Sequence, residues 1–182
     1  SGTTILLHDG EYDMSGGDNQ HRIRFLTPNV TLRSYSGNRS AVTLWGYYGT
    51  NEMLTVEASN ITIADITIRE AYNHPIHVTG GATSNVTGTL IYNVHIIDPG
   101  EQAIKINTGP GTYADDGRIE CSRIELTNNG RPNIRNGCYT GGVDGHQAMG
   151  WVVRLNHIEG FWCDTGLSEH GVHFWTASRD TL

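Results

Sequence analysis

The sequence predicts an all-β fold, a right-handed parallel β-helix (solenoid) of about six coils. Two repeated strand patterns that share one spacing indicate this fold, and the composition agrees with them. The chain has 182 residues, of which 23 are Gly and 37% are hydrophobic. Gly and β-branched residues both weaken helices, whereas they suit short strands joined by tight turns.

The first pattern is a pair of short strands separated by a two-residue bend, clearest in NITIADITI at residues 60–68. Four copies follow one another at intervals of about 30 residues, as expected for solenoid coils. Alternate strand residues face the same side, so each copy contributes inward residues to shared columns. The columns that we expect are Ile63, Ile91, Cys121 and Val153; Ile66, Val94, Ile124 and Asn156; and Ile68, Ile96, Leu126 and Ile158.

Cys121 and Asn156 differ in character from the other residues of these columns. Cys121 is expected to be a small core residue. Asn156 interrupts an apolar column, so it either forms hydrogen bonds along the turn or is a costly buried amide.

The second pattern is a single strand that follows each copy of the first. Its inward column is Ile76, Ile104, Val143 and Val172. The longest step in this column contains the insertion GRPNIRNGCYTGG at residues 130–142, which we expect to form a loop, because solenoids tolerate loop growth between coils. A β-sandwich is the alternative for many short strands, but it would not predict columns in matched register.

The domain organisation follows from these repeats. We expect one domain over residues 1–182, with irregular coils over residues 1–55 and regular coils over residues 56–182. The final SRDTL resembles the beginning of another strand pair, so the C-terminal end is expected to be uncapped. An open coil exposes apolar side chains and strand edges, which predicts a homo-oligomer formed through that end.

Charge and composition exclude some partners. The net charge is −7, and only one of the 12 basic residues is a lysine, which disfavours nucleic-acid binding. No apolar run approaches the ~20 residues that span a bilayer, so no membrane partner is expected. Cys138 and Cys163 are predicted to lie in loops, where they can pair or remain free.

The opening residues GTTILLHDGEYDMSGG, with TPNVTLRSYSGNRSAVTLWG and ASNITIADITIREA after them, resemble pectate-lyase-like β-helix proteins. Among these proteins, the quoted stretches most resemble the sequences of polysaccharide lyases of the alginate lyase and chondroitinase B type. The later stretch from GGVDGHQAMGW resembles bacterial right-handed β-helix repeat proteins. The resemblance covers most of the chain and is specific for the fold. The calcium ligands and the Lys–Arg pair of those lyases are not matched as a motif, so no catalytic role is carried over.

Candidate site residues come from the outward positions of the second pattern. Stacked strands are ~4.8 Å apart, so outward residues of successive coils form one patch. One outward column is His77, Lys105, Asp144 and His173, and the next is Thr79, Asn107, His146 and Trp175. Glu101, Glu169 and His170 lie in adjoining turns.

This patch suits a polysaccharide or oligosaccharide. The ring of Trp175 offers a platform for a sugar, and His77, Asn107, Glu169 and His170 can bind its hydroxyls. Lyase chemistry needs a base for the proton α to a uronate carboxylate, and His146, His173 and Lys105 are the candidates. Asp144 beside Lys105 favours the charged lysine, which argues for Lys105 as the neutralising cation and a histidine as the base.

Other assignments remain open. Outward polar residues are ordinary in a β-helix, and cross-strand ion pairs need no ligand. His95 and His157, in one row with Thr67 and Glu125, are expected to be surface residues. Zinc held by His146, His170, His173 and either Asp144 or Glu169 is a weak alternative. Calcium at Asp115 and Asp116 is another, and no cofactor is firmly indicated.

Three functions are consistent with these observations. The first is a polysaccharide lyase that acts on a uronate-containing glycan. The second is a non-catalytic glycan-binding or surface module, and the third is a truncated β-helix without a ligand. The location expected from the resemblance is extracellular or periplasmic, in a bacterium.

Overall fold

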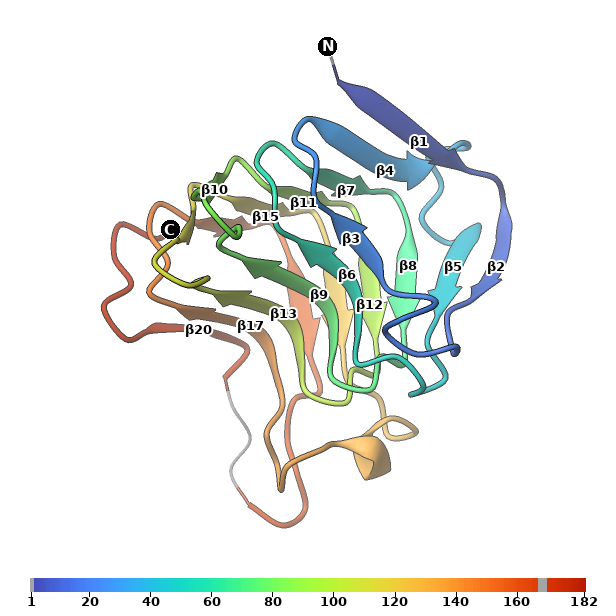
Figure 1. Cartoon of the computed structure of the whole chain (residues 1–182). Coiled ribbons are helices and arrows are strands. Elements are labelled where there is room, and N and C mark those ends of the chain that lie inside the picture. The colour runs from blue at the N-terminus through green and yellow to red at the C-terminus, as the bar shows by residue number, and fades with distance from the viewer. Residues whose placement is uncertain (1, 167–169) are drawn as a thin grey trace.

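A computed structural model describes residues 2–166 and 170–182, and it is a parallel β-solenoid of six coils (Figure 1). Each coil contributes one strand to each of three six-stranded sheets, and every pair of neighbouring strands in these sheets is parallel. The only described helix is the short 3-10 helix η1 (Arg131–Asn133). The predicted solenoid architecture is therefore confirmed, and the sandwich alternative is wrong.

The three sheets are numbered in the order in which each coil visits them. The first sheet contains β1 (Thr3–Leu7), β4 (Val30–Ser34), β7 (Thr62–Ala64), β11 (Leu90–Tyr92), β15 (Arg118–Glu120) and β18 (Val152–Arg154). The second contains β2 (Gly10–Asp13), β5 (Val42–Trp45), β8 (Thr67–Arg69), β12 (His95–Ile97), β16 (Arg123–Glu125) and β19 (His157–Glu159). The third contains β3 (Ile23–Phe25), β6 (Glu52–Val56), β9 (His74–Thr79), β13 (Gln102–Asn107), β17 (Gly141–His146) and β20 (Val172–Trp175). A separate pair joins β10 (Val86–Thr87) to β14 (Ala114–Asp115).

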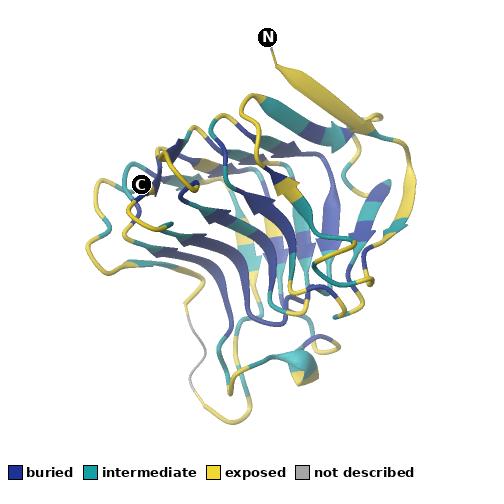
Figure 2. Ribbon diagram, in the orientation of Figure 1, coloured by how far each residue is buried: buried dark blue, intermediate teal, exposed yellow. Residues whose placement is uncertain are grey.

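The inward column of the third sheet has the register that the second pattern predicts. Ile76 pairs with Ile104, Ile104 with Val143, and Val143 with Val172. Leu54 and Ile23 continue this column to the first coil, so residues before 56 already follow the solenoid register. The middle coils bury the column, whereas Val172 in the last described coil is 44% exposed (Figure 2).

The register predicted for residues 119–126 is wrong by two positions. Ile119, not Cys121, pairs with Ile91 and Val153. Ile124, not Leu126, pairs with Ile96 and Ile158. Ile124 and Leu126 are both apolar and two residues apart, so the pattern alone fits either alignment. Arg123, rather than Glu125, therefore stands between His95 and His157 in the outward row.

The bend between the first and second sheets explains where Cys121 lies. Each of the last four bends has one residue with a positive φ: Asp65 (55°), Asn93 (50°), Cys121 (55°) and Leu155 (57°). Asp and Asn adopt this left-handed conformation more readily than other non-glycine residues. Cys121 is thus a half-buried free thiol in a bend, not a core residue as predicted.

Asn156 follows one of these bends. It forms hydrogen bonds along the turn, which is the first of the two alternatives predicted from the sequence. Its side-chain Oδ1 accepts the Ser122 N–H at 2.9 Å, and its Nδ2 donates to the Ile119 carbonyl at 2.8 Å. The amide is therefore satisfied along the turn.

Residues 130–140 of the insertion form a loop between β16 and β17, as predicted, and this loop includes η1. Residues 141–142 begin β17. A disulfide joins Cys138 in this loop to Cys163 in the corresponding connection of the next coil. Among the described residues no helix is long and apolar enough to cross a membrane.

Candidate functional site

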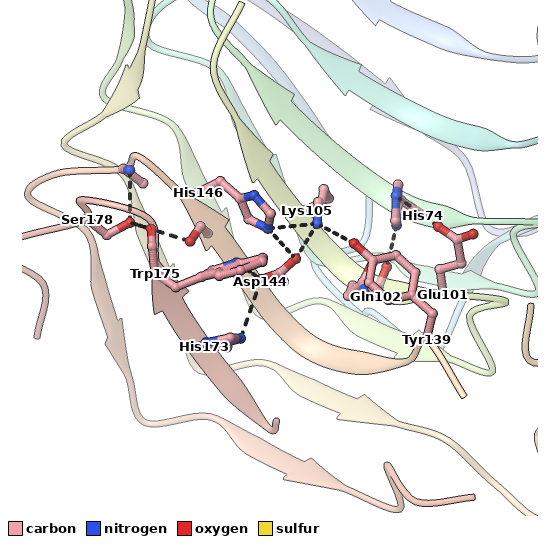
Figure 3. Close-up of polar contacts among 12 residues, drawn as sticks. His74, Glu101, Gln102, Lys105, Tyr139, Asp144, His146, His173, Trp175 and Ser178 are labelled. Carbon is pink, nitrogen blue, oxygen red and sulfur yellow. Dashed lines mark hydrogen bonds and ion pairs between the residues drawn. The ribbon is translucent and has the colours of Figure 1, made fainter. Parts of the chain in front are cut away.

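The outward residues of the third sheet lie side by side as the sequence predicts. Lys105 pairs in register with His77 on one side and Asp144 on the other, and Asp144 pairs with His173. In the next outward column Asn107 pairs with Thr79, and His146 with Trp175. Their inward neighbours Ile104 and Ile106 belong to the hydrophobic core. Strand alternation therefore directs Lys105 away from the core. Figure 3 shows Lys105 among its partners Asp144, His146 and Tyr139.

Lys105 and Asp144 form an ion pair that is covered rather than exposed. The Lys105 ammonium contacts Asp144 Oδ2, and the exposed fractions of the two residues are only 4% and 2%. The expectation of an open polar patch is therefore wrong at its centre. Side chains from a loop and from the next strand lie over this pair and exclude water from it.

Tyr139 is one of these covering residues, and the sequence reasoning missed it. Its hydroxyl lies 3.0 Å from Lys105 Nζ. Tyr139 ends the inserted loop just before β17, so the insertion that lengthens this coil also delivers a phenol to the lysine. The sequence feature that could have indicated Tyr139 is the position of the insertion, directly before the strand that contains Asp144.

The environment of Lys105 favours its charged form. Burial lowers the pKa of Lys105, but the hydrogen bonds and charge of Asp144, together with Tyr139, outweigh it, so this pKa lies above its ordinary value. A lysine that holds its proton this firmly is unsuited to act as a base near neutral pH. The predicted role of a fixed positive charge fits Lys105 better.

His146 is held beside both members of this pair. Its Nε2 lies 3.2 Å from Lys105 Nζ and 3.1 Å from Asp144 Oδ2. Burial, followed by the charge of Lys105, lowers the pKa of His146 despite the opposing effect of Asp144. The imidazole is therefore neutral near pH 7, and its side chain is 27% exposed. His146 has the protonation state and access that a general base needs.

Trp175 covers Asp144 from the last described strand. Its indole Nε1 donates to Asp144 Oδ1 at 3.0 Å, and its ring meets His146 edge-on with centroids 4.3 Å apart. The ring also stacks on His173 at 5.2 Å, and His173 contacts His170 at 4.5 Å. Trp175 is nevertheless 44% exposed. The site thus has a buried ionic floor and an accessible aromatic and imidazole rim.

A second buried group, which sequence reasoning passed over, lies one coil earlier on the third sheet. His74 Nδ1 donates to the Gln102 carbonyl at 3.1 Å, and its Nε2 lies 3.4 Å from Glu101 Oε2. Burial is the main cause that lowers the pKa of His74 to about 4, and burial also raises the pKa of Glu101. His77 bonds instead to Glu52, at 2.7 Å. The structure therefore connects the His77 side chain to Glu52 of the preceding coil.

The remaining predicted residues have fewer contacts with the Lys105–Asp144 pair. Asn107 lies in the expected column, but its Oδ1 is buried without a hydrogen-bond partner in the described part of the chain. Glu169 lies outside the described residues. Within residues 2–166 and 170–182 no three His, Cys, Asp or Glu side chains are placed to hold a metal together. The Asp115 carboxylate accepts the Met149 N–H at 2.9 Å and is largely buried.

Two pockets lie at opposite ends of the strands that form this site. One, of about 490 Å³, lies between the loops that precede β17 and β20 and includes Cys138 and Trp162 in its lining. The other, of about 310 Å³, lies where β13, β17 and β20 end and includes Tyr113, Gln147 and Arg179. Cys138 directly precedes Tyr139, and Gln147 directly follows His146, so both pockets adjoin the site.

Comparisons with known proteins add no family to this description. No family model matches the chain, and neither a curated protein nor a solved structure matches it. The function can therefore be inferred only from the chemistry of the site itself.

Proposed function

We propose that the protein is a carbohydrate-active enzyme that cleaves a uronate-containing glycan by β-elimination. The observation that carries the proposal is the contact between a neutral, partly exposed His146 and a buried, charged Lys105, at the edge of the accessible Trp175 ring. The solenoid fold is compatible with such an activity.

The chemistry assigned to each residue follows from its environment. The ring of Trp175 binds a sugar, and neutral His146 takes the proton from the carbon α to the uronate carboxylate. The electron pair of that C–H bond forms a double bond to the β carbon as the bond to the glycosidic oxygen breaks. The leaving oxygen takes its proton from the His146 imidazolium. Lys105 stabilises the negative charge that develops beside it, and the Asp144 carboxylate holds Lys105 and His146 in place.

The direct test is to incubate the protein with alginate, pectate and glycosaminoglycans, with and without calcium, and to follow the absorbance of the unsaturated product. We expect product with at least one of these polymers, and its loss in His146→Ala. His157→Ala is the matched control, because His157 lies on the second sheet and its side chain is 64% exposed. Absence of product from every polyuronate would contradict the proposal.

The pH dependence of this activity supplies a second test. His146 must be deprotonated, and its pKa is lowered by burial and by Lys105, so kcat/KM should rise with pH through a pKa below the ordinary histidine value. An acid limb at or above that ordinary value would argue against His146 as the base.

A non-catalytic glycan-binding module is the second candidate function. The closed Lys105–Asp144 pair favours it, because an ion pair this deeply buried can simply be structural. This candidate predicts glycan binding without product, retained in His146→Ala and weakened in Trp175→Ala. The enzyme proposal instead predicts that His146→Ala still binds but no longer turns over.

A further inference from the structure

The larger pocket is built by two loops that a disulfide joins. It has a volume of about 490 Å³ and lies between residues 128–138 and 162–165. The Cys138–Cys163 disulfide forms part of its wall, and Trp162 in the second loop is 50% exposed. A concave site with one accessible aromatic ring and several polar groups has the general character of a ligand pocket.

Arg131 fixes the shape of this pocket. Its guanidinium donates to the Thr127 carbonyl at 3.3 Å and to the Gly160 carbonyl at 3.1 Å, so it connects the two loops. It also lies 3.8 Å from the centre of the Trp162 ring. Stacking of this kind holds an aromatic ring in one orientation and leaves its other face for a ligand.

The charge of Arg131 suits an acidic ligand. In the part of the chain that the structure describes, Arg131 forms no ion pair with a carboxylate, and its partners are carbonyl oxygens and the Trp162 ring. Most of the other arginines are paired with Asp or Glu, as Arg24 is with Glu57. Asp164, also described by the structure, lines the same pocket but forms no ion pair with Arg131, so the guanidinium can still meet a carboxylate of the ligand.

The pocket is continuous with the candidate site along the chain. Cys138 lines the pocket, and the next residue, Tyr139, reaches Lys105 at 3.0 Å. The pocket therefore adjoins the end of the site at which β17 begins. A linear ligand that extends from Trp175 past Tyr139 would run toward the loop that lines this pocket.

We propose that this pocket is a second glycan subsite, which takes another acidic sugar of the same polymer through Trp162 and Arg131. It is formed only while the Cys138–Cys163 disulfide is intact, because the disulfide holds its two loops together. This inference rests on the proposed function and adds the length and charge of the substrate to it.

The experiment is calorimetric titration with alginate, polygalacturonate and hyaluronan oligosaccharides of increasing length. Trp162→Ala should weaken the binding of the longest oligosaccharides about tenfold, in the range expected for loss of one aromatic contact. The shortest oligosaccharide that still binds should be unaffected. Trp45→Ala is the matched control, because Arg69 lies 4.0 Å from the Trp45 ring on the second sheet, away from the site.

Reduction gives an independent measurement on the unmutated protein. Dithiothreitol, or the variant Cys138→Ser/Cys163→Ser, should cause the same selective loss for long oligosaccharides, whereas Cys121→Ser should not. Unchanged affinity for long oligosaccharides in Trp162→Ala, with loss in Trp175→Ala, would overturn the subsite and leave the proposed function standing. Failure of the unmutated protein to bind any of these glycans would overturn both.

Discussion

The second and third sheets carry similar outward residues, but only on the third sheet is the central ion pair almost completely covered. On the second sheet, Arg123 forms ion pairs with Glu125 at 2.8 Å and Glu159 at 2.9 Å, and its side chain is 45% exposed. His95 and His157 in the same row bond to these two glutamates. On the third sheet, the corresponding row contains Lys105 and Asp144, whose side chains are 5% and 2% exposed.

The difference comes from what lies above each row. An inserted loop brings Tyr139 over the third sheet, and Trp175 closes the row from the next strand. Exclusion of water strengthens the interactions of charged groups and shifts their pKa values, whereas exposed pairs are screened. One solenoid register thus yields an ordinary surface on one sheet and a candidate site on another.

The largest expected effect is on the covered ion pair. Asp144→Asn leaves the buried charge of Lys105 without its carboxylate, and we expect it to lower the free energy of unfolding by about 3 kcal/mol or more. Glu125→Gln on the second sheet should cost far less, because its partners are accessible to water. Denaturant unfolding of both variants checks this. Equal losses would show that the cover does not distinguish the two rows.

The disulfide should contribute an effect of similar order. It closes a loop with a sequence separation of 25 residues, so Cys138→Ala/Cys163→Ala should lower stability by about 3 kcal/mol on the chain-entropy account. Cys121→Ala is the control, because Cys121 is a half-buried free thiol. Thermal unfolding under non-reducing conditions measures both. A double variant as stable as the control would mean that other contacts hold the two loops in place.

The pH dependence of stability sharpens the comparison further. His74 has a folded pKa of about 4 against 6.5 in the unfolded chain, so the unfolded state binds more protons between these values. Its contribution is therefore complete above pH 6.5 and falls by about 3 kcal/mol as the pH decreases toward 4. The raised pKa of Glu101 opposes part of this decrease.

His74→Gln should remove most of this pH dependence. His95→Gln is its counterpart on the second sheet, where burial also lowers the pKa but Glu125 opposes the shift. We expect a smaller change there. Unfolding curves collected from pH 4 to 7 give the result. Identical profiles for the unmutated protein and His74→Gln would contradict the assignment.

The smallest expected effect is a stabilisation at a bend outside both rows. Leu155 has φ 57° and is 78% exposed, whereas the equivalent residues in two earlier coils are Asp65 and Asn93. Leu155→Asn should raise stability by about 0.5–1 kcal/mol, because asparagine adopts the left-handed conformation with less strain. A decrease in the thermal midpoint would contradict this explanation of the bends.

The sequence predicted the solenoid and the register of the third sheet. The inward residues of that sheet are β-branched or leucine and have polar neighbours, so the inward column can be recognised in the sequence. It failed at residues 119–126, where Ile124 and Leu126 both fit an inward position. Only the pairing of Ile124 with Ile96 and Ile158 decides between them.

The candidate site was predictable only in part. Lys105, Asp144, His146, His173 and Trp175 follow from strand alternation once the register is known. Tyr139 does not, because it lies in an inserted loop whose path depends on contacts with residues distant in sequence. The burial of Lys105 and Asp144 depends on that loop, so the strand pattern could not predict their burial either.

Hydrogen exchange with and without bound polyuronate tests the central claim most directly. We expect the glycan to protect amides in residues 139–146 and 172–178, which form and cover the third-sheet row, and to leave residues 118–125 and 152–159 unchanged. Protection confined to the first and second sheets, with the third-sheet segments unaffected, would contradict the account.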